Sequence, residues 1–273
     1  MTAPTLLLFD LDETIAPDEE TDRAVFAEIA ADEPAAQGVS VWRLLAALER
    51  AAAARWSTYE TAAYCARIGI SMWEGLWGPF GASDEPMLAA LHRLVPAYRV
   101  AVWGAALEAC GIQAPGLMEI LTEVMAQHFL TERRRRQAAY PWTHDALAGL
   151  RGRYRFGMIT NGAPDLQRLK LAGTGLADWF DPVVVSGELG VGKPEAAIFA
   201  HALALAGGVA PEAAVMIGDS WPRDVLGATS AGLRAVWINA RGVPTPALAG
   251  GSAGRIAAIP DLRGLAAVVD ALA

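Results

Sequence analysis

Five short apolar runs, each closed by a small or polar residue, constrain the fold of this chain more than any other feature of its sequence. They lie at 6–9, 154–160, 182–186, 213–218 and 235–238. Continuous apolar runs of this length are typical of strands that are buried on both faces of a sheet. The later runs are separated by helical stretches that begin with a proline, at 164–172, 194–206 and 222–231. Because strands and helices alternate, the sequence predicts an α/β fold built on a parallel sheet.

The long interval between the first two runs has a different pattern. Its apolar residues recur with the 3.6-residue period of a helix, and no run in it resembles a buried strand. We therefore expect an all-helical domain at 17–139, inserted into a Rossmann-like core that comprises 1–16 and 140–273. Near the end of the chain, 241–254 is rich in glycine, proline and alanine and is expected to be irregular. An edge strand at 255–259 and a final helix complete the predicted core.

Composition and charge exclude several classes of protein. With 53% hydrophobic and 19% charged residues among 273, the chain can bury a large core and does not resemble a disordered protein. A formal net charge of −8 argues against a general nucleic-acid binder. No apolar run approaches the ~18 residues that a membrane span requires, and Cys65 and Cys110 are too few for a disulfide framework. We expect a cytoplasmic monomer or homodimer with neither a nucleic acid nor a membrane as partner.

Polar side chains follow four of the predicted strands. They are Asp10 and Asp12 after the first strand, Thr160 and Asn161 at the end of the second, Lys193 beyond the third, and Asp219 and Asp224 beyond the fourth. Ligands of open parallel sheets bind beyond the carboxyl ends of the strands, so these residues are expected to form one site. Only two of the 22 basic residues, Lys170 and Lys193, are lysines, and a lysine therefore stands out against its background.

In their order and spacing these motifs resemble those of the haloacid dehalogenase (HAD) superfamily of hydrolases. The most similar group carries a helical cap directly after the first motif, which matches the helical interval at 17–139. The resemblance implies Mg²⁺-dependent hydrolysis of a small phosphorylated metabolite, a phosphate monoester, through an aspartyl-phosphate intermediate. The sequence departs from the family at Glu13, where many relatives carry Gly or Asn, and at 15–17. Neither departure removes a side chain that the family uses in catalysis. Both therefore bear on the choice of substrate and on the conformation of the segment after the first motif, and the expected reaction type is unaffected.

The resemblance also assigns roles to the four aspartates. Asp10 is the expected nucleophile, and Asp12 is expected to protonate the leaving oxygen and then to deprotonate the attacking water. Asp10 and Asp219 are expected to bind Mg²⁺ directly, Asp12 through its backbone carbonyl, and Asp224 directly or through water. Like charges ~4 Å apart repel by about 4 kcal/mol at an effective dielectric constant of 20, so such a cluster favours a cation. Mg²⁺ prefers oxygen ligands of this kind.

The remaining motif residues are expected to bind the transferring phosphoryl group. By the resemblance, Thr160 and Lys193 hold its oxygens, and Lys193 also offsets the charge of the attacking carboxylate. Asn161 and Gly162 offer backbone N–H groups to an anion.

Three other functions are compatible with parts of the pattern. A phosphomutase would return the phosphoryl group to a sugar instead of water. A non-catalytic binding protein could retain the fold, although every expected catalytic residue is present. A dehalogenase is less favoured because Asp12 supplies an acid/base carboxyl that displacement of halide from carbon does not require.

An arginine run and two tryptophans also stand out within the helical interval. The run Arg133–Arg136 is interpreted as a solvated helix face rather than a substrate site. Trp73 and Trp77 lie in a stretch punctuated by Gly and Pro and are candidates for a surface that faces the substrate, against the alternative of packing within the cap.

Overall fold

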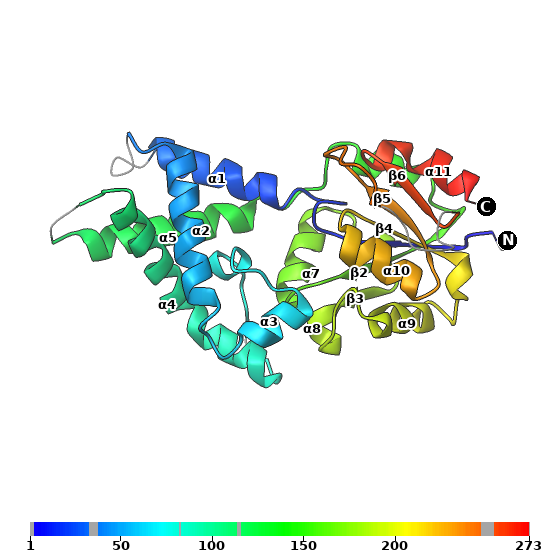
Figure 1. Cartoon of the computed structure of the whole chain (residues 1–273), viewed down its shortest axis with the longest axis horizontal. Helices are drawn as coiled ribbons and strands as arrows, with labels where there is room; N and C mark the ends of the chain where they lie inside the picture. Colours follow the sequence, from blue (N-terminus) through cyan, green and yellow to red (C-terminus); the bar gives the residue numbers. More distant parts are fainter. Residues whose placement is uncertain (1–2, 33–37, 82, 114–115, 247–253, 273) are drawn as a thin grey trace. The chain divides into compact units, whose positions relative to one another are not determined.

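The computed structural model describes residues 3–32, 38–81, 83–113, 116–246 and 254–272 (Figure 1). The chain divides into two compact units, one comprising 1–17 with 138–273 and the other comprising 18–137. Of the helices in the described part of the chain, none combines the length and the apolarity needed to cross a membrane.

The first unit is built on a parallel sheet of six strands in the order β3-β2-β1-β4-β5-β6 (Figure 1). The strands are β1 (Leu6–Phe9), β2 (Arg155–Thr160), β3 (Val183–Val185), β4 (Ala214–Gly218), β5 (Arg234–Ile238) and β6 (Ile256–Ile259). Every pairing is parallel, which confirms the predicted α/β fold, and each strand end lies within one residue of its predicted position. β1 occupies the centre of the sheet between β2 and β4.

The register of β1 determines which strand ends meet. Phe9 pairs with Met158 of β2 on one side and with Ile217 of β4 on the other. The backbone N–H of Asp10 donates to the carbonyl of Ile217 at 2.8 Å, so the β1 ladder continues as far as this aspartate. The residues that follow β1 and β4 therefore leave the sheet side by side.

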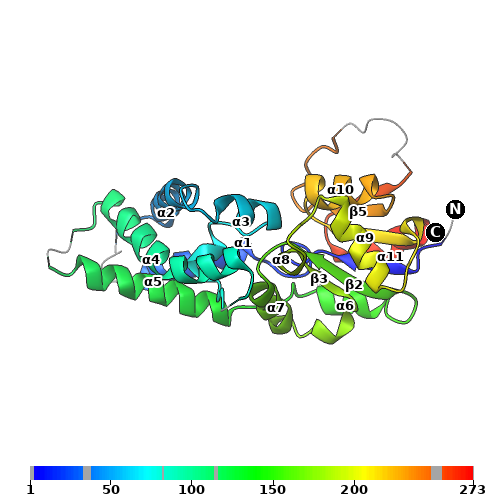
Figure 2. The same ribbon diagram turned by 90° about the horizontal axis from the view of Figure 1, so that it is seen from below.

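Helices cover both faces of this sheet, as Figure 2 shows from a second direction. On one face, Leu7 and Phe9 pack with α6 (Thr143–Ala148), α7 (Pro164–Gly173) and α11 (Leu265–Ala271). On the other face, Leu6 and Leu8 pack with α9 (Ala196–Leu205) and α10 (Gly227–Ser230). Successive side chains of a strand point to opposite faces, so a strand that is covered on both sides is apolar throughout.

Several predicted elements of this unit have a different form in the structure. The predicted helix at 222–231 is a π-helical turn, η5 (Trp221–Leu226), followed by α10. The final helix begins as a 3₁₀ turn, η6 (Leu262–Gly264), before α11. The short helices α6 and α8 (Ser186–Leu189) and the 3₁₀ turns η3 (Ala177–Trp179) and η4 (Pro211–Ala213) were not predicted. Within the segment expected to be irregular, 242–246 forms no helix or strand, and 247–253 lies outside the described residues.

Among its described residues, the second unit contains helices and the turns between them but no strand. Its elements are α1 (Glu19–Asp32), α2 (Val41–Trp56), α3 (Ala62–Ile68), the 3₁₀ turn η2 (Glu74–Leu76), α4 (Pro86–Ala109) and α5 (Met118–Arg135). α4 packs against both α2 and α5, and α1 packs against α5. An aromatic cluster lies at the centre, where the rings of Phe26 and Phe129 stack 4.2 Å apart and Trp103 contacts both.

The four-arginine run is not a solvated face, and that interpretation is wrong. The Arg133 side chain is 1% exposed, forms ion pairs with Asp18 and Asp22, and lies over the Trp77 ring at 4.0 Å from its centroid. Arg136 donates to Glu28 at 2.7 Å, and among the four only Arg135 is largely exposed, at 73% of its side chain. The ion pairs compensate the Arg133 charge, which allows it to be buried.

Trp77 does not face a ligand, because its side chain is fully buried inside the helical unit, beneath Arg133. The prediction of a surface role for Trp77 is therefore wrong. Trp73 is half-buried and packs edge-on against Phe26, with the ring centroids 5.9 Å apart.

Candidate active site

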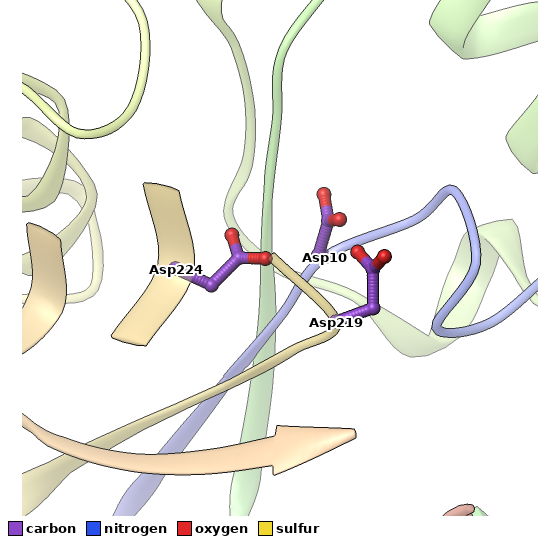
Figure 3. Close-up of side chains that lie close together, drawn as sticks. All are labelled: Asp10, Asp219 and Asp224. Carbon is purple, nitrogen blue, oxygen red and sulfur yellow. The ribbon is translucent and has the colours of Figure 1, made fainter. Parts of the chain in front are cut away.

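Three carboxylates converge beyond the carboxyl ends of β1 and β4. Asp10 follows β1, Asp219 follows β4, and Asp224 lies in the η5 turn, and each offers an oxygen within 4.8 Å of the others (Figure 3). Asp10 and Asp224 are buried and Asp219 is half-buried. The sequence predicted all three as members of one site, and the structure brings them together.

The turn after β4 directs the Asp224 carboxylate into this cluster. Its Oδ2 accepts from the backbone N–H of Ser220 at 2.9 Å. The backbone carbonyl of Asp219 accepts from the Trp237 indole N–H at 2.8 Å, which ties the turn to β5. A Cβ atom on Gly218 would lie 2.3 Å from Asp224 Oδ2, so only glycine allows this close approach.

Lys193 lies between two of the carboxylates. Its Nζ is 2.6 Å from Asp10 Oδ1 and 2.7 Å from Asp224 Oδ1, and its side chain is 2% exposed. The Asn161 side chain holds the Lys193 backbone, because Nδ2 donates to the Lys193 carbonyl at 2.9 Å and Oδ1 accepts from its N–H at 2.8 Å. Asn161 therefore connects the end of β2 to the loop that contains Lys193, which we call the lysine loop. This contact was not predicted.

Thr160 and Gly162 already have partners within the protein. The Thr160 hydroxyl donates to Gln167 Oε1 of α7 at 2.9 Å, and Thr160 is 1% exposed. The Gly162 N–H donates to Ser186 Oγ at 2.8 Å. Since that N–H is taken, the expectation that Gly162 offers it to an anion is wrong.

The Asp12 carboxylate is not one of the three clustered carboxylates and contacts α7 instead. Its Oδ2 accepts from Lys170 Nζ of α7 at 3.0 Å. The next residue, Glu13, has a φ of 57°, the left-handed region that glycine and asparagine occupy at least cost. Tyr140 donates to Glu13 Oε2 at 3.0 Å, which fixes this unusual turn.

Lys170 and Gln167 belong to the site but were not predicted as members. The prediction considered residues that directly follow strands, whereas these two are the fourth and seventh residues of α7. The scarcity of lysine was the one signal that distinguished Lys170.

The electrostatics of the cluster favour a cation. Burial, and then the charges of Asp10 and Asp224, raise the pKa of Asp219 to about 8. Burial raises the pKa of Asp224 to about 6, although Lys193 opposes this shift. Burial tends to lower the pKa of Lys193, but Asp10 and Asp224 outweigh it and the pKa is raised. One ammonium therefore does not balance three clustered carboxylates, and their oxygens are the hard ligands that Mg²⁺ takes.

Comparisons with known proteins agree with this geometry. Residues 4–232 match the family model of haloacid dehalogenase-like hydrolases. The chain is 39% identical over 235 residues to a phosphoserine phosphatase of Thermus thermophilus, with 86% of this chain and 88% of that protein covered. A HAD phosphatase structure from Thermococcus onnurineus has a TM-score of 0.54 and 26% identity, with 97% of each chain covered. A 2-haloacid dehalogenase structure from Pseudomonas syringae has a TM-score of 0.55 and 26% identity, covering 99% of this chain and 100% of that one.

Proposed function

We propose, from the premise that this chain belongs to the haloacid dehalogenase-like hydrolases, that it is a Mg²⁺-dependent phosphatase of small phosphate monoesters. The observation that carries the proposal is the convergence of Asp10, Asp219 and Asp224 around Lys193 beyond the ends of β1 and β4. A relative and a similar solved structure that are named as phosphatases support the same reaction type.

Asp10 is proposed as the nucleophile. One of its oxygens attacks phosphorus while the bond between phosphorus and the ester oxygen breaks, and the leaving oxygen takes a proton from Asp12. Water then attacks the aspartyl-phosphate, Asp12 removes its proton, and inorganic phosphate leaves as the Asp10 carboxylate is restored. Dividing the reaction in this way replaces one very slow step by two easier ones.

Lys193 and Thr160 are proposed to hold the transferring phosphoryl group. The Lys193 ammonium contacts Asp10 Oδ1 at 2.6 Å. A phosphoryl group bound at Asp10 would therefore lie next to this positive charge, which would stabilise its negatively charged oxygens. Thr160 reaches the group once its hydroxyl turns from Gln167. Asn161 is proposed to contribute through its backbone N–H while its side chain holds the lysine loop.

The carboxylates of Asp10, Asp219 and Asp224 are the proposed side-chain ligands of Mg²⁺, with the Asp12 carbonyl as a further ligand. When bound, the ion neutralises negative charge on the phosphoryl oxygens and helps to orient them for in-line attack.

The helical unit is proposed to act as a cap that selects the leaving group. It is inserted directly after the first motif, between Pro17 and Ala138, and the four core motifs account only for the phosphoryl group. Lids that close over a bound substrate exclude water from the reaction and complete the site in many enzymes.

A dehalogenase is the second candidate, because one similar structure at 26% identity is a 2-haloacid dehalogenase. Displacement of halide from carbon needs a carboxylate nucleophile but neither a carboxyl that donates a proton to the leaving group nor a divalent cation. The presence of Asp12 and of the acidic cluster therefore favours phosphoryl transfer.

The test is a release assay with the purified chain. Phosphate release is measured with Mg²⁺ across O-phosphoserine, sugar phosphates, nucleoside monophosphates and phosphoglycolate, and halide release from 2-chloropropionate. We expect phosphate release that EDTA abolishes and that Asp10→Asn loses while remaining folded by circular dichroism. Halide release without phosphate release would establish the dehalogenase instead. Full activity of Asp10→Asn would refute the proposed nucleophile.

A further inference from the structure

One face of α7 reaches two residues of the proposed site. Gln167 and Lys170 are three positions apart and therefore lie on the same side of the helix. Gln167 accepts from the Thr160 hydroxyl at 2.9 Å, and Lys170 donates to Asp12 Oδ2 at 3.0 Å. Both α7 side chains belong to buried residues, at 1% and 2% exposure. The helix is thus attached at one end of this face to β2 and at the other to the turn after β1.

The Lys170 ammonium is an unusual group to bury at this position. The chain has only two lysines among 22 basic residues, and each of them contacts one aspartate of the first motif. A buried ion pair is weak evidence for stability, because apolar residues of similar volume often stabilise a fold as well or better. The Lys170–Asp12 pair therefore suggests a role in the reaction rather than in folding.

We infer that Lys170 is a positioning residue that holds the Asp12 carboxylate in the orientation needed for proton transfer to the leaving oxygen. The inference rests on the proposed function, in which Asp12 is the general acid and base. The Asp12 side chain is 27% exposed and has two rotatable bonds, and the contact of its Oδ2 with the buried Lys170 ammonium at 3.0 Å restricts rotation of the carboxylate. A compact ammonium on a buried stem fixes one carboxylate oxygen and thereby the direction of the other.

This role predicts an effect that depends on the leaving group. Protonation matters most when the leaving oxygen is strongly basic and least when it is a stable anion such as p-nitrophenolate. Loss of the Lys170 contact should therefore slow poor leaving groups selectively. A purely structural defect would slow all substrates by a similar factor.

The experiment compares kcat/KM for a series of substituted phenyl phosphates, from p-nitrophenyl phosphate to p-methoxyphenyl phosphate, in Lys170→Met and wild type. We expect Lys170→Met to lose about 10- to 100-fold on the poorest leaving group and only ~3-fold or less on p-nitrophenyl phosphate, as for a misplaced general acid. Lys170→Arg, which keeps the charge, should lie between the two. Arg168→Met, which removes an exposed cation from the same helix, is the matched control and should leave the series unchanged.

A double-mutant cycle with Asp12→Asn tests whether Lys170 acts through Asp12, and it remains informative if Lys170→Met alone folds poorly. The variant Asp12→Asn/Lys170→Met carries neither charge, so it leaves no buried ammonium without its partner. If Lys170 acts through Asp12, this variant should match Asp12→Asn within ~3-fold, because coupled residues are not additive. A further loss beyond that, or an equal loss for every leaving group in Lys170→Met, would overturn the inference. Failure of the proposed function itself differs, since the wild type would then release no phosphate from any member of the series.

Discussion

Lys193 contacts both Asp10 and Asp224, and its geometry suits a compact ammonium. The lysine is almost fully buried, which leaves little room for the larger, planar guanidinium of arginine. We predict that Lys193→Arg lowers kcat by about 10²- to 10³-fold, the scale seen when one charge-stabilising donor is lost.

The measurement is steady-state hydrolysis of p-nitrophenyl phosphate with saturating Mg²⁺, with circular dichroism to establish folding. Arg168→Lys, an exchange of side-chain type at an exposed position of α7, is the control and should keep full activity. Retention of most activity by Lys193→Arg would mean that only the charge of Lys193 matters.

The raised pKa values of Asp219 and Asp224 predict how the metal-free protein responds to pH. A carboxyl whose folded pKa exceeds its unfolded value of ~3.9 binds more protons in the folded state. The free energy of unfolding therefore falls as the pH rises from about 4 through the folded pKa values of about 6 for Asp224 and about 8 for Asp219. We expect the melting temperature in EDTA to fall from ~pH 5 to ~pH 9.

Mg²⁺ should counteract this fall. A bound cation stabilises the ionised carboxylates, so its addition should raise the melting temperature more at ~pH 8 than at ~pH 5. Asp219→Asn removes the group with the highest of these pKa values and should flatten the pH dependence in EDTA. If the melting temperature of Asp219→Asn in EDTA falls with pH as steeply as that of the wild type, other groups are responsible for the pH dependence.

The sequence predicted the site residues that directly follow strands, and it predicted them for a physical reason. Asp10 and Asp219 follow neighbouring parallel strands, so their convergence depends only on the sheet order. Lys170 and the side-chain role of Asn161 could not be predicted in this way. Each contact depends on how closely a helix or loop packs beside the sheet. The hydrophobic periodicity of the sequence carries no information on the distance between such segments.

The turn between β4 and α10 is an element that the sequence predicted only in part. Its proline and apolar spacing predict a helix, but the structure contains the π-helical turn η5 before α10. In η5 the N–H groups of Asp224 and Val225 both donate to the Ser220 carbonyl, at 2.8 and 3.3 Å. The turn buries Asp224 against Gly218, and π-helical turns of this kind are frequent at functional sites.

Gly218 gives a direct test of this element. Its substitution by alanine would place Cβ 2.3 Å from Asp224 Oδ2, so the carboxylate or the turn must shift. We predict a destabilisation of about 1–3 kcal/mol from overpacking, together with weaker Mg²⁺ binding. Thermal unfolding and isothermal titration with Mg²⁺ measure the two effects. Gly149→Ala is the control, because no atom lies closer than 3.8 Å to a Cβ at that position. Unchanged Mg²⁺ affinity in Gly218→Ala would argue against Asp224 as a ligand.

At the scale of the whole molecule, the two points where the helical unit leaves and rejoins the core lie next to each other. The Tyr140 N–H donates to the Ile15 carbonyl at 3.0 Å, and the Thr143 hydroxyl donates to the same carbonyl at 3.2 Å. Among the described residues, the two clusters that pack on the faces of the sheet are formed by the first unit. The sheet is therefore complete without the insertion.

We predict that replacing 18–137 with a short glycine-rich linker gives a folded core. Closing a short loop between adjacent ends costs little entropy. The shortened protein should bind Mg²⁺ and retain measurable hydrolysis of p-nitrophenyl phosphate, but it should lose discrimination among natural phosphate monoesters. Circular dichroism and the substrate panel check this outcome. A core that keeps the full-length ranking of substrates would assign selectivity to the sheet instead of the helical unit.

The Ile15–Tyr140 contact also bears on how such a protein can change over evolutionary time. Because a backbone hydrogen bond joins the two strand-side segments there, residues 18–137 leave and re-enter the core at one place. We expect changes in the length or sequence of the helical unit to cost the core little, because its two ends are already held together. Under the proposed function, an exchange of the helical unit would alter the choice of substrate while the carboxylate cluster of the core is kept.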